Sequence, residues 1–163
     1  MERNDMRNRK TQKIALVGAL ALAMSLTASL ATAKSADKST GGVEYTTATG
    51  NPGAMASFNA HETPKGQVEL SGVGPLGDIR FHGIVTCYFR TGDNSARFSG
   101  EMTETNGPGF THFYIGVEDN GSPGTSGDRI SVQRRTAAVD CEEDPLASPF
   151  REVTGGNLKV HHS

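Results

Sequence analysis

Apolar and polar residues alternate along most of the chain after residue 54, and this period of two constrains the fold more than any other feature. The longest run lies between Asp78 and Thr91, and shorter runs follow it. Side chains of a β-strand point alternately to its two faces, so each run predicts a strand with one face in a core. The residues expected in that core are Phe58, Phe81, Val85, Phe89, Phe98, Phe113, Ile115 and Val117.

Breaks rich in glycine, proline and asparagine separate these runs, for example at 106–109 and 119–124. Short strands that recur about every ten residues between such breaks are typical of antiparallel β-proteins. No window of the sequence after residue 54 has the period of a long amphipathic helix. The sequence therefore predicts an all-β fold, an antiparallel β-sandwich or small β-barrel of about seven strands, in a single domain at 54–163.

The first 33 residues have the three parts of a secretory signal peptide. Basic residues between Arg3 and Lys13 come first, an apolar run follows from Ile14, and Ala31-Thr32-Ala33 forms a cleavage site of the A-x-A type. Glycine, serine and threonine interrupt the run before it reaches the about 20 apolar residues that a transmembrane anchor requires. We therefore expect a signal peptide at 1–33, a flexible tether at 34–53, and a secreted protein, extracellular or in the cell envelope, without a stable membrane anchor after cleavage.

Charge and composition restrict the possible partners. The first 33 residues hold five of the 16 Lys and Arg and two of the 18 Asp and Glu, so the remainder has 11 basic and 16 acidic residues and a formal charge of −5. Nucleic acids and anionic lipid surfaces favour basic proteins, so neither is expected as a partner. The expected partner is an extracellular ligand or a component of the cell envelope.

The two cysteines of the chain, Cys87 and Cys141, both follow the predicted signal peptide. An even number of cysteines in an exported protein indicates a disulfide bond, and the alternative is two buried free thiols. Because Cys87 lies in the strongest predicted strand and Cys141 in the irregular segment 137–150, a bridge would pin that segment as a loop to the core.

Two histidines offer the best candidate surface site. His82 and His112 occupy outward positions of two predicted strands, and Tyr88, Tyr114 and Glu118 share the same parity. If the strands are neighbours, two imidazoles and a carboxylate form a face for Zn²⁺ binding or acid–base chemistry. Neither histidine belongs to an H-x-H or H-E-x-x-H motif, so exposed polar strand residues are the alternative interpretation.

The segment 119–128 is a candidate for a metal of another kind. Asp119, Asn120 and Asp128 supply oxygen atoms among glycines and prolines, and Ca²⁺ is bound by such oxygens. The spacing matches no EF-hand, and Asp-Asn-Gly is also common in hairpin turns. A structural turn is therefore the competing interpretation.

No spacing of Ser, His, Asp or Cys in the sequence forms a recognisable nucleophilic site, so no catalytic residue and no cofactor is predicted. The function expected from these features is a non-enzymatic binding or cell-envelope module. The alternative is a small secreted hydrolase or metal-dependent enzyme that uses the His82/His112 face.

Four segments resemble a group of small secreted β-domain proteins of actinobacterial type whose function is unknown. They are Ser57-Phe58-Asn59-Ala60, Gly83-x-Val85-Thr86-Cys87, Asp119-Asn120-Gly121-Ser122-Pro123-Gly124 and Gly156-Asn157-Leu158-Lys159-Val160-His161. The resemblance covers most of the chain after residue 54, and its motifs fall on turns and core strands. It implies a bacterial, exported β-domain and adds no catalytic residue.

Overall fold

The structure is a computed structural model. The predicted signal peptide, residues 1–33, lies outside the residues that it describes. The described residues are 36–47, 49–63, 65–74, 77–121, 126–143, 145–146 and 149–163. Among them, no helix has the length and apolar character that crossing a membrane requires.

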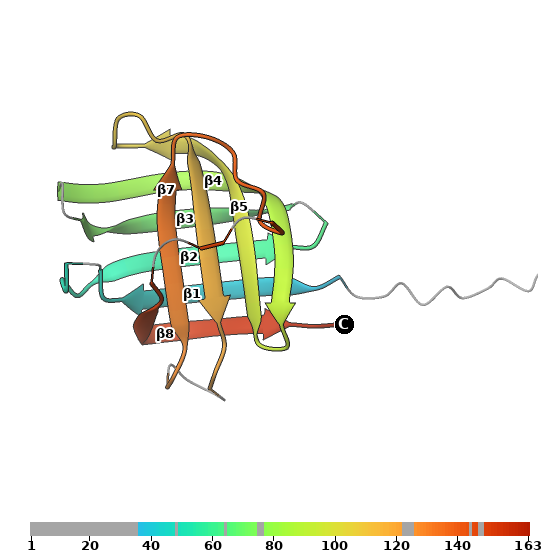
Figure 1. Cartoon of the computed structure of the whole chain (residues 1–163). Helices are drawn as coiled ribbons and strands as arrows, with labels where there is room; N and C mark the ends of the chain where they lie inside the picture. The colour runs from blue at the N-terminus through green and yellow to red at the C-terminus, as the bar shows by residue number, and fades with distance from the viewer. Residues whose placement is uncertain are drawn as a thin grey trace, which may run out of the picture. The chain divides into compact units, whose positions relative to one another are not determined.

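The described residues form eight antiparallel strands that close into a barrel (Figure 1). Each strand pairs with the next one in the sequence, and the last strand pairs with the first. This topology confirms the predicted all-β fold and shows that, of the two architectures expected, the barrel forms. The strands are β1 (Lys38–Tyr45), β2 (Ala54–His61), β3 (Lys65–Gly74), β4 (Gly77–Gly92), β5 (Ser95–Thr105), β6 (His112–Glu118), β7 (Arg129–Arg135) and β8 (Arg151–His161).

Strand β1 corrects the prediction that residues 34–53 form a flexible tether, because Lys38–Tyr45 pairs with both β2 and β8. Val43 and Tyr45 point into the barrel and are buried. Gly41 also faces the core, where a Cβ atom would lie 2.5 Å from Cζ of Phe58. The composition of the segment suggested too little apolar surface for order, but backbone hydrogen bonds to two neighbours and a ring packed on a glycine hold it in the barrel.

Figure 1 shows the barrel as two layers whose strands cross. Strands β8, β1, β2 and β3 form one layer, and β5, β6 and β7 form the other, as expected for orthogonal packing. Strand β4 joins the layers, and its pairing with β5 shifts register between His82 and Gly83 and again between Val85 and Cys87. At the opposite corner, in the described part of the chain, β7 and β8 share only the pairs Arg129–Glu152 and Ile130–Arg151.

The interior of the barrel is filled by aromatic side chains. The ring centroids of Phe58 and Phe98 lie 5.3 Å apart, and those of Phe81 and Phe113 lie 5.8 Å apart. These separations are typical of favourable aromatic pairs. Seven of the eight predicted core residues are buried there, namely Phe58, Phe81, Val85, Phe98, Phe113, Ile115 and Val117.

The eighth predicted core residue, Phe89, is not in the barrel interior. The register shift between Val85 and Cys87 reverses the alternation in the second half of β4, so Tyr88 points inward and is only 9% exposed. Its hydroxyl forms a hydrogen bond of 3.1 Å with Oγ of Ser39. Phe89 lies outside, where its ring centroid is 5.7 Å from the guanidinium carbon of Arg97. A β-bulge of this kind moves every later side chain to the other face.

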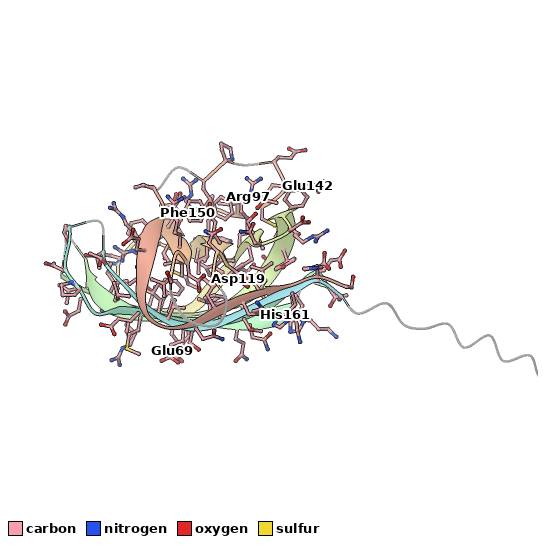
Figure 2. The ribbon with its side chains drawn as sticks, turned by 90° about the horizontal axis from the view of Figure 1, so that it is seen from below. Glu69, Arg97, Asp119, Glu142, Phe150 and His161 are labelled. Atoms are coloured by element: carbon pink, nitrogen blue, oxygen red, sulfur yellow. A yellow bond between two sulfur atoms is a disulfide. The ribbon has the colours of Figure 1, made fainter. Side chains whose placement is uncertain are left out.

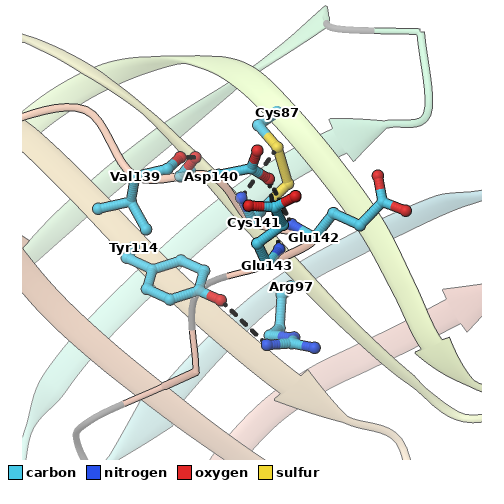
Figure 3. The surroundings of a disulfide bond; sticks show 9 residues. Cys87, Arg97, Tyr114, Val139, Asp140, Cys141, Glu142 and Glu143 are labelled. Atoms are coloured by element: carbon cyan, nitrogen blue, oxygen red, sulfur yellow. Dashed lines mark hydrogen bonds between the residues drawn. A yellow bond between two sulfur atoms is a disulfide. The ribbon is translucent and has the colours of Figure 1, made fainter.

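The irregular segment between β7 and β8 comprises residues 136–150, and we call its described residues, 136–143, 145–146 and 149–150, the strap. The strap lies over the outer face of β5, β6 and β7 (Figure 1). The disulfide Cys87–Cys141 joins it to β4, with a Cα–Cα distance of 6.0 Å, which confirms the predicted bridge (Figure 3). Oγ of Ser99 donates a hydrogen bond of 2.8 Å to the carbonyl oxygen of Val139. The strap therefore covers the outer face of this layer instead of extending into solvent.

Candidate binding face

The predicted histidine face does not form as a single surface. His82 lies on β4 and His112 on β6, and β5 separates the two strands. Glu104 lies opposite His82, and Glu101 lies opposite His112. Nε2 of His82 lies 3.8 Å from an oxygen of Glu69 on the other side, on β3. The two imidazoles therefore have different neighbours and do not converge on one point.

The other three residues of the predicted histidine face are engaged elsewhere. Tyr88 lies inside the barrel, and burial raises the pKa of its hydroxyl. Tyr114 is fully buried beneath the strap, where its hydroxyl oxygen accepts a hydrogen bond of 3.4 Å from Nη1 of Arg97 (Figure 3). Glu118 forms an ion pair of 3.2 Å with Arg129. The prediction that these side chains share an exposed surface with the histidines is therefore wrong for both tyrosines.

The candidate metal turn at 119–128 is closed by its own hydrogen bonds. Oδ1 of the buried Asp128 accepts from the backbone N–H groups of Asn120, at 3.0 Å, and Gly121, at 3.2 Å. Nδ2 of Asn120 donates to the carbonyl oxygen of Gly127 at 3.0 Å. Burial raises the pKa of Asp128, while the two N–H groups oppose that shift. Among the described residues, no group of three or more His, Cys, Asp and Glu could hold a metal ion.

Asp119 connects this turn to β8. Its Oδ2 lies 3.2 Å from Nζ of Lys159 and accepts a hydrogen bond of 3.2 Å from the backbone N–H of Val160. This carboxylate therefore joins the end of β6 to β8 near the corner where β7 and β8 diverge. The contacts of Asp119, Asn120 and Asp128 fit a structural turn.

No described segment covers the side of the barrel opposite the strap (Figure 2). Phe150 and Glu142, which belong to the strap, lie on one side of the molecule, and Glu69 and His161 lie on the other (Figure 2). We call the outward-pointing residues of β8, β1, β2 and β3, and of β4 as far as Ile84, the open face. Outward-pointing residues of these strands are exposed or half-buried in the described part of the chain.

The two ends of the open face differ in chemistry. At one end, Met55 is 59% exposed and Val73 is 47% exposed, on the adjacent strands β2 and β3. A shallow hollow lies beside them at the junction of β3 and β4, where the side chain of Asn106 bonds to the backbone of Arg80 and Asp78. The hollow is lined by Ser71, Gly72, Val73, Asp78, Ile79, Arg80 and Asn106.

At the other end of the open face, four basic or titratable side chains lie in one row, and we call it the basic row. Lys38 of β1 is paired with His161 of β8 on one side and with His61 of β2 on the other, and His61 is paired with Lys65 of β3. Burial lowers the pKa of His161, and the positive charges of Lys38 and Lys159 lower it further. His161 is therefore mainly uncharged at neutral pH, and the formal positive charges of the row are those of Lys38 and Lys65.

Sequence reasoning missed the basic row. Its members lie far apart in the chain, and Lys38 falls in the segment predicted to be a tether. The sequence offered one indication of the row, the alternation of side chains along each strand, because His61 and Lys65 both occupy outward positions of their strands. This alternation gives the face on which a side chain lies. It does not give the register between strands, which places these residues side by side.

Comparisons with protein families, curated proteins and solved structures found no match. The resemblance to small secreted actinobacterial-type proteins therefore stays a prediction. The function is argued below from the surfaces of the barrel.

Proposed function

We propose that this chain is exported and that its barrel is a non-enzymatic binding module of the cell envelope, which contacts its ligand through the open face. The observation that carries the proposal is the difference between the two outer sides of the barrel. One side is covered by the strap, and the other presents exposed apolar and basic side chains on a regular sheet.

The filled interior supports binding on the outside. Eight-stranded barrels have room for side chains alone or for one small ligand. Here Phe81, Phe98 and Phe113 are fully buried and pack with Phe58 across the interior. A ligand inside the barrel would have to displace these rings, so the outer surface is the better candidate.

The exposed apolar residues support the open face in particular. Met55, Val73 and Ile84 are the large apolar side chains with high exposure among the described residues, and all three belong to this face. On the opposite side of the barrel, by contrast, Leu146 and Phe150 of the strap pack over Gly116 of β6. Apolar surface is thus covered on one side of the barrel and left in solvent on the other, which is typical of an interaction site.

The disulfide indicates an oxidising environment, in agreement with the export that the N-terminal segment predicts. The enzymatic alternative, a hydrolase or metal-dependent enzyme built on His82 and His112, has less support. These residues lie on strands separated by β5, and His82 has a solvent-exposed partner in Glu69. Catalytic groups need mutual geometry that this spacing does not provide.

The test is sedimentation of the protein, recovered after export, with purified cell-envelope fragments. We expect the protein to sediment with the fragments. The double variant Met55→Glu/Ile84→Glu should bind them at least about tenfold more weakly, because two apolar contacts are replaced by charge. The control is Ala137→Glu, which adds a carboxylate to the exposed surface of the strap.

Equal binding by the wild type, the double variant and the control would exclude the open face as the contact surface. Absence of sedimentation of the wild type would exclude the envelope-binding function itself. Loss of binding in the double variant alone, with an unchanged circular dichroism spectrum, is the result that supports the proposal.

A further inference from the structure

We propose that the basic row of the open face binds a linear acidic polysaccharide, one that carries uronate or sulfate groups. This inference rests on the proposed function, since it names the chemistry of the ligand that the open face takes. Three observations support it. The register of four strands aligns the row, neither lysine of the row forms an ion pair with a described residue, and polar side chains occupy the neighbouring row.

Register places the row across the strands. Residues that are paired in an antiparallel sheet point to the same face, and neighbouring strands lie about 4.8 Å apart. The pairs His161–Lys38, Lys38–His61 and His61–Lys65 therefore form one line over β8, β1, β2 and β3. Two lysines in one line with two imidazoles, which also form hydrogen bonds, match a linear chain with repeated anionic groups better than they match a compact anion.

The positive charge of the row is available to a ligand. In the described part of the chain, neither Lys38 nor Lys65 forms an ion pair. The nearby carboxylate of Asp37 contacts Nε of Arg90 at 3.1 Å and accepts hydrogen bonds from Ser163. Asp37 therefore does not neutralise the lysines by direct contact.

The neighbouring row of the same face carries three uncharged hydrogen-bonding groups, next to Lys159 of β8, which pairs with Thr40 and forms an ion pair with Asp119. Thr40, Asn59 and Gln67 lie side by side on β1, β2 and β3, because Thr40 pairs with Asn59 and Asn59 pairs with Gln67. Hydroxyl and amide groups donate and accept hydrogen bonds, as the hydroxyl groups of a sugar require. Two lysines in one row, and three neutral polar side chains with a further lysine in the next, thus match an acidic polysaccharide that lies across the strands.

The same surface is less suited to the other polyanions. None of the described residues on the open face is Phe, Tyr or Trp, the large aromatic residues on which the bases of single-stranded nucleic acids stack. A lipid surface favours apolar groups next to cations. Here Met55 and Val73 lie at the opposite ends of β2 and β3 from His61 and Lys65, so that of the three exposed large apolar side chains only Ile84, which pairs with Gln67, lies near the row.

The experiment measures binding of the full chain to polygalacturonate at low ionic strength, with neutral dextran, phosphatidylglycerol vesicles and a thymidine oligonucleotide as comparisons. We expect binding to polygalacturonate and not to dextran. Binding should weaken as salt is added, because exposed charges are screened. The double variant Lys38→Gln/Lys65→Gln should bind about tenfold more weakly, since two charge contacts are lost.

The matched control for the single variant Lys65→Gln is Arg129→Gln. Both remove one positive charge, but Arg129 belongs to β7, beneath the ring of Phe150 of the strap. An equal loss of affinity in the two variants would show a general charge effect and overturn the basic row as the site. Stronger binding to the vesicles or the oligonucleotide than to polygalacturonate would overturn the ligand class.

This test separates the inference from the proposed function. If the protein sediments with envelope fragments through the open face but does not bind polygalacturonate, the polysaccharide inference alone fails. If it does not sediment with envelope fragments and does not bind polygalacturonate, both fail.

Discussion

Replacement of Phe113 by alanine tests the packing of the barrel interior most directly. Phe113 is fully buried, and its ring is stacked on that of Phe81 with a centroid distance of 5.8 Å. Two glycines border the ring, since a Cβ atom on Gly83 would lie 2.5 Å from its Cε1 and one on Gly100 would lie 2.7 Å from its Cζ. Neither glycine has a side chain that could move into the space left by the ring.

We therefore expect Phe113→Ala to lower the free energy of unfolding by about 3 to 5 kcal/mol, the range for a large cavity that does not collapse. This is a large part of the stability of a typical domain. The measurement is urea unfolding with the disulfide intact. Glu101→Ala is the control, because Glu101 is exposed on the adjacent strand and its loss should cost less than about 0.5 kcal/mol.

A double-mutant cycle of Gly83→Ala and Phe113→Ala tests the contact between these two residues specifically. Gly83→Ala should destabilise the wild type, because the new methyl group would meet the ring of Phe113. It should destabilise the Phe113→Ala variant less, since two of the three atoms nearest to the new methyl group belong to the ring of Phe113 and the third is the carbonyl oxygen of Glu101. Equal urea midpoints of unfolding for Phe113→Ala and Glu101→Ala would refute this account of the interior. Additive effects of Gly83→Ala and Phe113→Ala on the free energy of unfolding would refute it as well.

Removal of the disulfide by Cys87→Ser/Cys141→Ser should lower the free energy of unfolding by up to about 4 kcal/mol, as measured in urea. The same variant should make Tyr114 accessible to acrylamide quenching, because the strap that covers it is no longer bonded to β4. Tyr88→Phe removes the hydrogen bond to Ser39 and should cost about 1 kcal/mol in the same assay, and no cost would argue against an inward Tyr88. Asp128→Asn keeps an acceptor for the N–H groups of Asn120 and Gly121 but does not titrate. Because burial raises the pKa of Asp128, protonation favours the folded state, and that contribution is lost as pH rises through the folded pKa. The stability of the asparagine variant relative to the wild type should therefore increase between about pH 3 and pH 7, and a constant difference would contradict the raised pKa.

The alternation of residues was sufficient to predict the strand class and most of the core, because side-chain parity is a local property of each strand. It was not sufficient for the second half of β4. After Val85, both alternating sets contain an aromatic residue, Tyr88 in one and Phe89 in the other. The pattern therefore held no information on which of them is inside, and the bulge before Cys87 decided the question.

The candidate site was harder to predict because it depends on register between strands that are distant in sequence. His82 and His112 have the expected outward parity, yet the order of the strands puts β5 between them. Lys38 and His161 are separated by almost the whole described chain, yet the closure of β8 on β1 makes them direct neighbours. A surface site on a closed barrel is thus set by where the last strand pairs with the first. A shift of this pairing by one residue would turn His161 inward, bring Val160 to the outer face and break the basic row.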